Sequence, residues 1–201
     1  MGKGARARGY SPRRVDTRET IQKFLIVCEG EQTEPNYFRK FRVPKQVARV
    51  DVHGLGANTE SLVRRAVGLR DEDEYDQVWC VFDRDSFRVE SFNAALALAA
   101  REGIQVAYSN EAFELWYLLH FHYFNTGMSR ADYGGKLTAL LGFKYEKNIE
   151  AIFEALWSRR DAAIRNAENL LASYPVPRPA SDNPSTTVHL LIRELLRFEL
   201  R

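Results

Sequence analysis

The sequence of 201 residues contains few of the residue types that hold small secreted or metal-rich domains together. Only two cysteines occur, Cys28 and Cys80, and both lie inside apolar runs. We therefore expect buried thiols in a reducing cytoplasm and no disulfide framework, although neighbouring strands could bring the pair face to face. The four histidines are isolated or two residues apart, so they do not predict a metal site.

Long apolar runs are missing as well. No stretch approaches the roughly 20 residues that a membrane helix needs, and the first 18 residues lack the apolar core of a secretory signal. We expect a cytoplasmic protein with no membrane partner. Neither GxxxxGK[ST] nor GxGxxG follows an expected strand, which indicates that the chain has no ATP-binding site of its own. A composition of 45% hydrophobic and 28% charged residues is typical of a globular domain.

Charge is unevenly distributed along the chain. Residues 1–18 carry a net charge of +5, so the net +2 of the whole chain leaves −3 for the other 183 residues. This Gly- and Arg-rich stretch has no periodicity, and we expect residues 1–20 to form a flexible basic arm. Arg13 and Arg14 are candidates for contacting nucleic-acid phosphates, because such contacts are electrostatic and independent of sequence. The alternative is a solubilising tail.

Expected strands and helices alternate from the end of the arm to residue 124. The strands are apolar without polar alternation, which is typical of parallel strands covered on both faces. We therefore predict an α/β core with a mostly parallel sheet and helices on both faces. The expected strands are 24–28, 47–54, 77–83 and 104–110, and the expected helices are 34–42, 58–70, 89–103 and 111–121.

After residue 124 the pattern becomes helical. Residues 125–135 are polar and contain glycine, which predicts a loop. Helices are expected at 136–142, at 148–173 as one long amphipathic segment, and at 186–200 with Ser185 as its cap. The predicted organisation is a basic arm (1–20), an α/β core (21–124) and a C-terminal helical extension (125–201) packed on that core.

Acidic residues follow two of the expected strands. Glu29 ends the first strand, and the run VWCVFDRDSF ends the third strand in Asp83 and Asp85. Sites in parallel α/β sheets form beyond the carboxyl ends of the strands, so we expect these three carboxylates to converge. Like charges held together need a cation, and Mg²⁺ prefers oxygen ligands. The alternatives are solvated strand ends, a helix cap at Asp85, and a pair between Asp83 and a nearby arginine.

Two further glutamates extend this prediction. Glu34 lies in the loop after the first strand, and Glu114 opens the helix after the fourth. Either of them is a candidate for supporting a second metal ion. The alternative for Glu114 is a favourable interaction with its own helix N-terminus. A lone Asp-x-Asp is a weak signal, whereas the ordered combination of a Glu after strand one and Asp-x-Asp after strand three is moderately specific.

These blocks carry a family resemblance. FLIVCEG followed by VFDRD resembles the Toprim domain of topoisomerases, bacterial primases and OLD-type nucleases. FLIVCEGEQTEPNYF, VWCVFDRDSF, YSNEAFELWYLLHF and NPSTTVHLL, in this order, resemble more narrowly the RloB-like family of bacterial proteins. The resemblance extends from Phe24 to Leu191, which is most of the chain.

The resemblance implies a Toprim-like fold and a Mg²⁺-dependent nuclease of bacterial abortive infection and anti-phage defence. Members of the family can be encoded with an ATPase partner. The Toprim acid corresponds to Glu29 and the aspartate pair to Asp83 and Asp85. Glu34 and Glu114 occupy further acidic positions of the family blocks. OLD-type nucleases often use a later lysine, for which the sequence offers the candidates Lys136, Lys144 and Lys147.

Two hypotheses from different classes follow. In the first, the protein is an endonuclease for RNA, with tRNA as one candidate, or for DNA, in which Mg²⁺ or Mn²⁺ activates water. Its contacts with phosphates are expected from Arg13, Arg14, Arg84, Lys144 and Lys147. In the second, it is a non-catalytic interaction or sensor module that docks on an ATPase or senses a phage product, and a homodimer is possible. The apolar helices at 111–124 and 148–173 are candidate partner faces, with core packing as the alternative.

Overall fold

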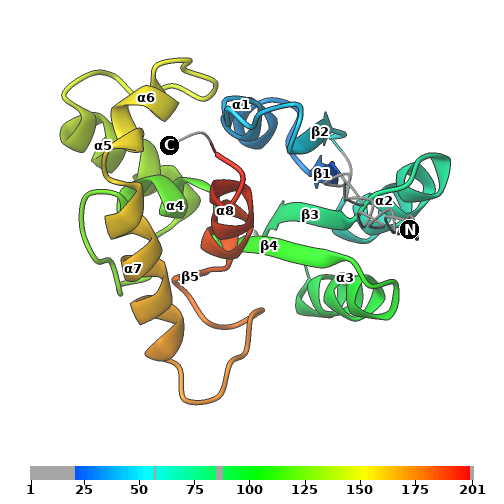
Figure 1. Cartoon of the computed structure of the whole chain (residues 1–201). Coiled ribbons are helices and arrows are strands. Elements are labelled where there is room, and N and C mark those ends of the chain that lie inside the picture. Colours follow the sequence, from blue (N-terminus) through cyan, green and yellow to red (C-terminus); the bar gives the residue numbers. More distant parts are fainter. Residues whose placement is uncertain (1–20, 57, 85–87, 200–201) are drawn as a thin grey trace, which may run out of the picture.

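A computed structural model describes residues 21–56, 58–84 and 88–199 of the chain. One five-stranded sheet has the order β2-β1-β3-β4-β5, in which only β5 runs antiparallel (Figure 1). The strands are β1 (Gln22–Cys28), β2 (Ala48–Gly54), β3 (Gln77–Asp83), β4 (Gln105–Asn110) and β5 (Ser185–Thr186). The described helices are α1 (Thr33–Arg39), α2 (Thr59–Glu72), α3 (Val89–Arg101), α4 (Glu114–Leu119), α5 (Arg130–Leu141), α6 (Ile152–Trp157), α7 (Arg160–Ala172) and α8 (Val188–Leu196). The predicted α/β class with helices on both faces is confirmed.

Each face of the sheet has its own apolar core, which explains why the strands are continuously apolar. Successive side chains of a strand point to opposite faces. Phe24 and Ile26 of β1 belong to the core shared with α1 and α4–α8, whereas Leu25 belongs to the core shared with α2 and α3. Cys28 and Cys80 fall into different cores, so the two buried thiols lie on opposite faces and do not pair.

Several expected boundaries are confirmed and three are wrong. Asn58 caps α2, because the backbone N–H of Ser61 donates to its side chain at 3.1 Å. The expected helix at 148–173 is instead two helices that break at Ser158 and Arg159. The apolar residues of both α6 and α7 are buried in the same core. The turn between the two helices allows the apolar side of each helix to face that core.

The other two corrections lie nearer the sheet. Residues 125–135 are not all loop, because α5 begins at Arg130, whose backbone N–H donates to the Glu111 carboxylate at 3.1 Å. Ser185 does not cap the last helix. It pairs with β4 as part of β5, and the neighbouring Thr186 hydroxyl donates to the carbonyl of Tyr108 at 2.9 Å. Sequence periodicity could not show that this short strand precedes α8.

The described residues 21–56, 58–84 and 88–199 include no helix that is both long enough and apolar enough to cross a membrane.

Neighbouring leucines on α8 test the packing of the last helix against the sheet. Leu191 is fully buried, whereas Leu190 is 42% exposed. We expect Leu191→Ala to lower the free energy of unfolding by about 2–5 kcal/mol, because it leaves a cavity in a packed core. Leu190→Ala is the matched control and is expected to cost less than about 0.5 kcal/mol. Urea unfolding measures both, and equal losses would show that α8 is not packed as described.

Candidate acidic site

The pairing of β1 with β3 brings their carboxyl ends together. Cys28 lies beside Val81 in the parallel register. The backbone N–H of Glu29 donates to the Val81 carbonyl at 2.8 Å, which continues the ladder by one residue. The Glu29 carboxylate then accepts a hydrogen bond of 3.1 Å from the backbone N–H of Asp83. The predicted convergence of these two positions is therefore present in the fold.

Of Glu29 and Asp83, Asp83 is the buried residue. It follows Val81 by two residues, so its side chain points to the face of the sheet that α1, α4 and α5 cover. Its side chain is only 7% exposed, and its Oδ2 lies 3.2 Å from a guanidinium nitrogen of Arg130 at the start of α5. The Arg130 side chain is 44% exposed. A half-exposed cation thus faces a buried carboxylate.

Glu34 lies on α1 with its carboxylate against the loop after β1. A side chain at Gly30 would meet that carboxylate, so the Glu34 side chain would have to shift if Gly30 were replaced. Glu34 is buried, and its Oε2 has no hydrogen-bond partner among the described residues. A buried carboxylate oxygen without a partner is costly unless a donor or a cation reaches it.

Glu114 is held by a tyrosine from the segment after α5. Glu114 is buried at the first residue of α4, and the Tyr145 hydroxyl donates to its Oε1 at 3.1 Å. Every residue of α4 is buried, so this helix packs inside the chain and does not offer the exposed partner face that the sequence left open. Core packing also fixes the position of Glu114.

The electrostatic environment links these groups, and we call Glu29, Glu34, Asp83 and Glu114 together with Arg130 the acidic centre. Burial raises the pKa of Asp83 well above its usual value; Glu34, Glu114 and Glu29 raise it further, whereas Arg130 lowers it. Burial is also the largest cause of the raised pKa of Glu34, to which Glu114 adds. The carboxylates therefore lie close enough to repel one another.

The chemistry of the acidic centre fits a hard divalent cation, because its donors are carboxylate oxygens and one of them is unpartnered. These side chains do not form a complete set of ligands: among residues 21–56, 58–84 and 88–199, no three His, Cys, Asp or Glu side chains are arranged to hold one ion. Asp85, the third predicted ligand, lies outside the described residues. Arg130 supplies the positive charge next to Asp83.

The predicted nucleic-acid contacts are placed unequally. Arg13 and Arg14 lie outside the described residues. Lys147 lies close enough to Glu34 to lower the pKa of that carboxylate. Lys144 is 80% exposed and pairs with Glu146 at 2.7 Å. Arg84 donates through Nε to the carbonyl of Ala180 at 3.1 Å.

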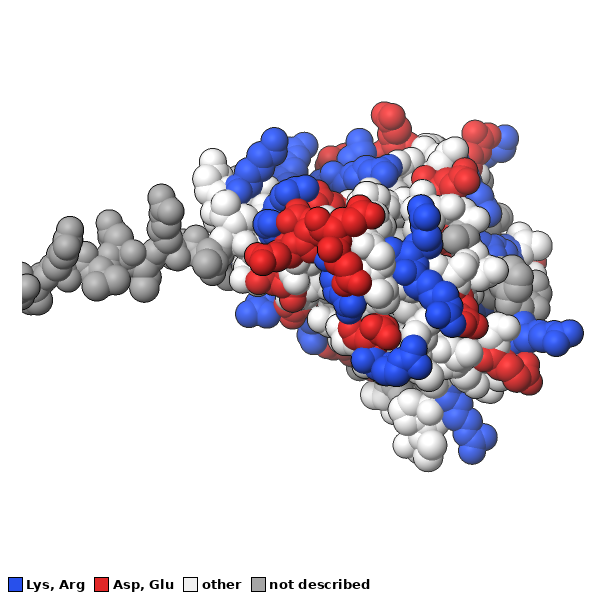
Figure 2. All heavy atoms as spheres, turned by 90° about the vertical axis from the view of Figure 1, so that its right-hand side faces the viewer, with Lys and Arg blue, Asp and Glu red and all other residues white. Residues whose placement is uncertain are grey.

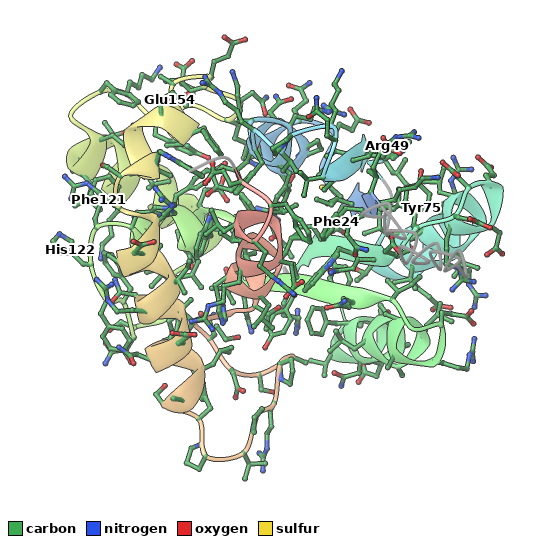
Figure 3. All side chains as sticks on the ribbon, in the orientation of Figure 1. Phe24, Arg49, Tyr75, Phe121, His122 and Glu154 are labelled. Atoms are coloured by element: carbon green, nitrogen blue, oxygen red, sulfur yellow. The ribbon has the colours of Figure 1, made fainter. Side chains whose placement is uncertain are left out.

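The remaining candidates lie outside the acidic centre. Lys136 lies over the ring of Phe124, with its ammonium 4.9 Å from the ring centroid. His120 is buried against Trp116, and burial lowers its pKa to about 4, so it is a neutral packing residue. His122 projects from the outer side of the molecule, away from the sheet (Figure 3).

Sequence reasoning missed Arg130, Tyr145 and Tyr133. Arg130 lies in the segment 125–135 that was predicted to be a loop, and the arginines expected near Asp83 were its neighbours in sequence. Tyr145 lies in the segment between α5 and α6, where no periodicity marks it. Tyr133 is buried, and its hydroxyl has no hydrogen-bond partner in the described part of the chain. Burial is the largest cause of its raised pKa, followed by the charge of Glu111.

Comparison with known proteins identifies the family. The model of the RloB-like protein family matches residues 24–195. The match covers most of the chain, so the chain belongs to the RloB-like family, as the sequence blocks predicted. Neither the search of curated proteins nor that of solved structures found a match.

Neutralising Glu34 tests whether the acidic centre costs stability. The raised pKa of Glu34 means that the folded state binds this proton more tightly than the unfolded state does. The wild type therefore loses stability as the pH rises from the usual value of 4.5 through the raised value. In EDTA at pH 7, we expect Glu34→Gln to raise the free energy of unfolding by about 1 kcal/mol or more, because a buried charged acceptor without a partner costs at least that much.

The gain from Glu34→Gln should shrink as the pH falls toward 4.5, and urea unfolding at several pH values measures it. Glu31→Gln is the matched control, because Glu31 is exposed. A Glu34→Gln protein that is no more stable than the Glu31→Gln protein at any pH would contradict the described burial of charge.

Proposed function

We propose, with membership of the RloB-like family as the premise, that this protein is a metal-dependent endonuclease that cleaves RNA, such as tRNA, or DNA in the bacterial cytoplasm during anti-phage abortive infection. The observation that supports this proposal is the acidic centre. Its carboxylates converge at the carboxyl ends of parallel strands, where the ligand sites of α/β sheets form. If the acidic centre only formed structural ion pairs, its carboxylate oxygens would be expected to have partners. Glu34 Oε2 has none among the described residues.

In this proposal Glu29, Asp83 and Asp85 hold Mg²⁺ or Mn²⁺. The ion, when bound, would lower the pKa of a water molecule and offset charge on the phosphate oxygens. Glu34 or Glu114 would support a second ion. Glu34 and Asp83 already have raised pKa values, so a bound cation would favour their charged forms and relieve the repulsion between them.

The remaining side chains near the acidic centre would bind the phosphate of the substrate or orient the carboxylates. Arg130 is half exposed and long, so it can leave Asp83 and donate to a phosphodiester oxygen, where a guanidinium offsets developing negative charge. Tyr145 orients Glu114 through its hydroxyl. Lys147, near Glu34, would contact a flanking phosphate. Arg84 and Lys144 would do so further from the acidic centre.

The distribution of surface charge limits how nucleic acid approaches. The face shown in Figure 2 carries a patch of Asp and Glu side chains with Lys and Arg interspersed around it. Continuous basic surface favours nucleic-acid binding, and mixed charge of this kind does not. We therefore propose that the strand ends, where Arg130 and Lys147 lie, receive the substrate.

A second candidate function is a non-catalytic module that works with an ATPase partner or as a homodimer. The Arg130–Asp83 pair favours it, because a guanidinium already supplies the positive charge that a metal would otherwise bring. The two functions differ in what happens to Arg130: it must move for metal to bind, whereas in the module it stays paired.

Removing Asp83 tests the proposed nuclease. The purified protein would be incubated with total bacterial tRNA, single-stranded RNA and plasmid DNA, in Mg²⁺, in Mn²⁺ and in EDTA. We expect cleavage of at least one substrate in metal and none in EDTA. Asp83→Ala should lower the rate about a hundredfold or more, since metal and acid–base groups each contribute at least that much.

Asp161→Ala is the control for this experiment, because the Asp161 side chain is 75% exposed and lies on α7. It should cleave like the wild type. If no substrate is cut although the protein is folded, the module hypothesis replaces the nuclease.

Changes at Arg130 separate its two roles. We expect Arg130→Ala to lower the cleavage rate about a hundredfold, because a guanidinium donor to the negative charge of the transition state is lost. Arg130→Lys keeps the charge without the planar fork and should retain part of the activity. Arg165→Ala, at an exposed position of α7, is the control. Full activity of Arg130→Ala would show that Arg130 only neutralises Asp83.

A further inference from the structure

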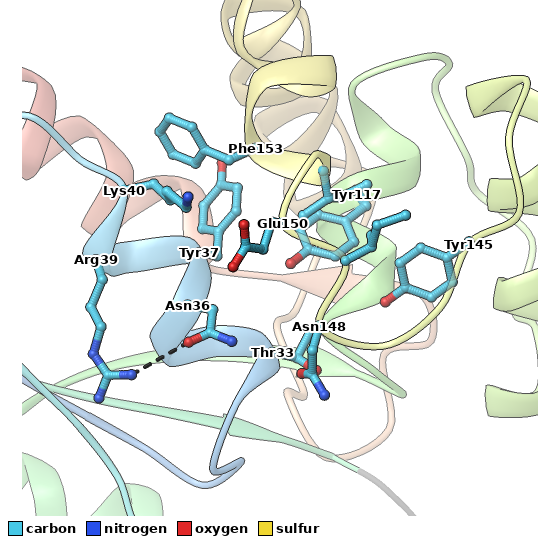
Figure 4. Close-up of a pocket in the computed structure, with 12 residues that line it drawn as sticks. Thr33, Asn36, Tyr37, Arg39, Lys40, Tyr117, Tyr145, Asn148, Glu150 and Phe153 are labelled. Atoms are coloured by element: carbon cyan, nitrogen blue, oxygen red, sulfur yellow. Dashed lines mark hydrogen bonds between the residues drawn. The ribbon is translucent and has the colours of Figure 1, made fainter.

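A cavity of about 360 Å³ lies next to the acidic centre, between α1 and the segment that leads into α6 (Figure 4). Its volume falls in the range of about 300–1,000 Å³ that is typical of sites for small molecules. We call it the α1 pocket. It is lined by Thr33, Asn36, Tyr37, Arg39, Lys40, Tyr117, Tyr145, Asn148, Ile149, Glu150, Ile152 and Phe153.

The α1 pocket shares its walls with the acidic centre. Thr33, in its lining, directly precedes Glu34. Tyr145 lines the pocket and donates its hydroxyl to Glu114 at 3.1 Å. Tyr117, also in the lining, is buried with its pKa raised first by burial, then by neighbouring tyrosines and by the charges of Glu34 and Glu114. A molecule in the pocket would therefore lie one side chain away from the carboxylates.

The inner wall of the α1 pocket is aromatic. The ring of Tyr37 lies 5.6 Å from that of Tyr117 and 5.2 Å from that of Phe153, measured between centroids. The Tyr37 hydroxyl accepts a hydrogen bond from the Trp116 indole in the core, so the polar end of this ring is already satisfied. These three rings are almost fully buried, so the inner wall offers an apolar but limited surface to a group in the pocket.

The mouth of the pocket carries charged and amide side chains. Arg39 is anchored by hydrogen bonds to the Val52 carbonyl at 3.1 Å and to Asn36 Oδ1 at 3.4 Å. Asn36 is exposed, and Figure 4 shows its amide nitrogen on the side away from Arg39. Lys40 is exposed, whereas Glu150 adds one carboxylate. Two cations suit a phosphate, and amide and carboxylate groups suit the edge of a base.

The wall opposite α1 is held in place by one asparagine. Asn148 adopts a φ of +73°, in the left-handed region that few residues other than glycine and asparagine tolerate. Its Oδ1 accepts a hydrogen bond from the Thr33 hydroxyl at 3.1 Å, and its amide nitrogen donates to Gln32. These contacts join the segment before α6 to the start of α1, so both walls of the pocket are linked.

We propose that the α1 pocket takes the base of an unpaired nucleotide whose neighbouring phosphate lies at the acidic centre. The inference rests on the proposed function. The apolar inner wall, the amide, carboxylate and cationic groups at the mouth, and the wall shared with the acidic centre all fit one nucleotide of a strand. A base inside a continuous duplex is stacked and paired, and it cannot enter a pocket without leaving the helix. The preferred substrate is therefore single-stranded, looped or bulged nucleic acid.

Binding in EDTA tests the inference without cleavage. Fluorescein-labelled oligonucleotides of one sequence would be compared by fluorescence anisotropy: single-stranded RNA, single-stranded DNA, a blunt duplex and a duplex with one bulged nucleotide. We expect the single strands and the bulged duplex to bind about tenfold or more tightly than the blunt duplex. The RNA and DNA arms show whether the sugar contributes.

Filling the pocket provides the matched pair of variants. Asn36→Trp places a large side chain at the mouth of the pocket, and we expect it to lower the affinity for single strands to that for the blunt duplex. Asn93→Trp makes the same change at an exposed position of α3, on the opposite face of the sheet, and should bind like the wild type. Circular dichroism and urea unfolding confirm that both variants are folded.

The outcomes also separate this inference from the proposed function. Equal affinity of the wild type for all four oligonucleotides, or an Asn36→Trp protein that keeps the preference, would overturn the pocket. A third outcome would also overturn it. In that outcome the wild type binds a free nucleoside monophosphate tightly, Asn36→Trp abolishes this binding, and the wild type shows no preference among the oligonucleotides. The same oligonucleotides in Mg²⁺ then test the nuclease: cleavage without strand preference refutes only the pocket, and strand preference without cleavage refutes only the nuclease.

Discussion

The burial of Asp83 beside other carboxylates is the constraint on which the structure of this site depends. Taking a carboxylate from water costs free energy, and like charges nearby add to that cost. Arg130 offsets part of it with an ion pair of 3.2 Å from the start of α5. The helix is itself tied to the loop after β4 through Glu111. The start of α5, which sequence patterns did not predict, is thus held to the end of β3 by this charge, while Tyr133 and Leu137 pack the helix into the core.

A group of carboxylates with raised pKa values is poorly suited to stability and well suited to binding a cation. Burial raises the pKa of both Asp83 and Glu34, and Glu34 keeps an oxygen without a partner among the described residues. The chain retains this cost although apolar residues of similar size would remove it. Buried carboxylates with raised pKa values at the ends of parallel strands are characteristic of functional sites, although they lower the stability of the fold. The same reasoning extends to the α1 pocket, where Asn148 adopts a left-handed conformation beside the acidic centre.

Much of the fold could be predicted from the sequence because its strongest signals are local. The apolar run Phe24–Cys28 and the run that ends in Asp83 are each buried on both faces, and such runs are typical of parallel strands. The alternation of strands with helices fixes which ends meet, so the convergence of Glu29 with Asp83 followed. Four blocks in order that resemble the RloB-like family predicted the family, which the match over residues 24–195 confirms.

The rest depends on contacts between distant segments that no local pattern contains. Arg130 reaches Asp83 across 47 residues, and Tyr145 reaches Glu114 across 31. The predicted helix at 148–173 was wrong because its apolar period continues through a turn at Ser158 and Arg159. Asp85, Arg13 and Arg14 lie outside the described residues, so their roles stay predictions.

Isothermal titration calorimetry with Mg²⁺ and Mn²⁺ tests the central claim, that the acidic centre is a site for a divalent cation, most directly. The account predicts saturable binding to the wild type, loss of that binding in Asp83→Asn, and wild-type binding in Asp161→Asn. Absence of binding to the folded wild type, or binding that Asp83→Asn leaves unchanged, would contradict it.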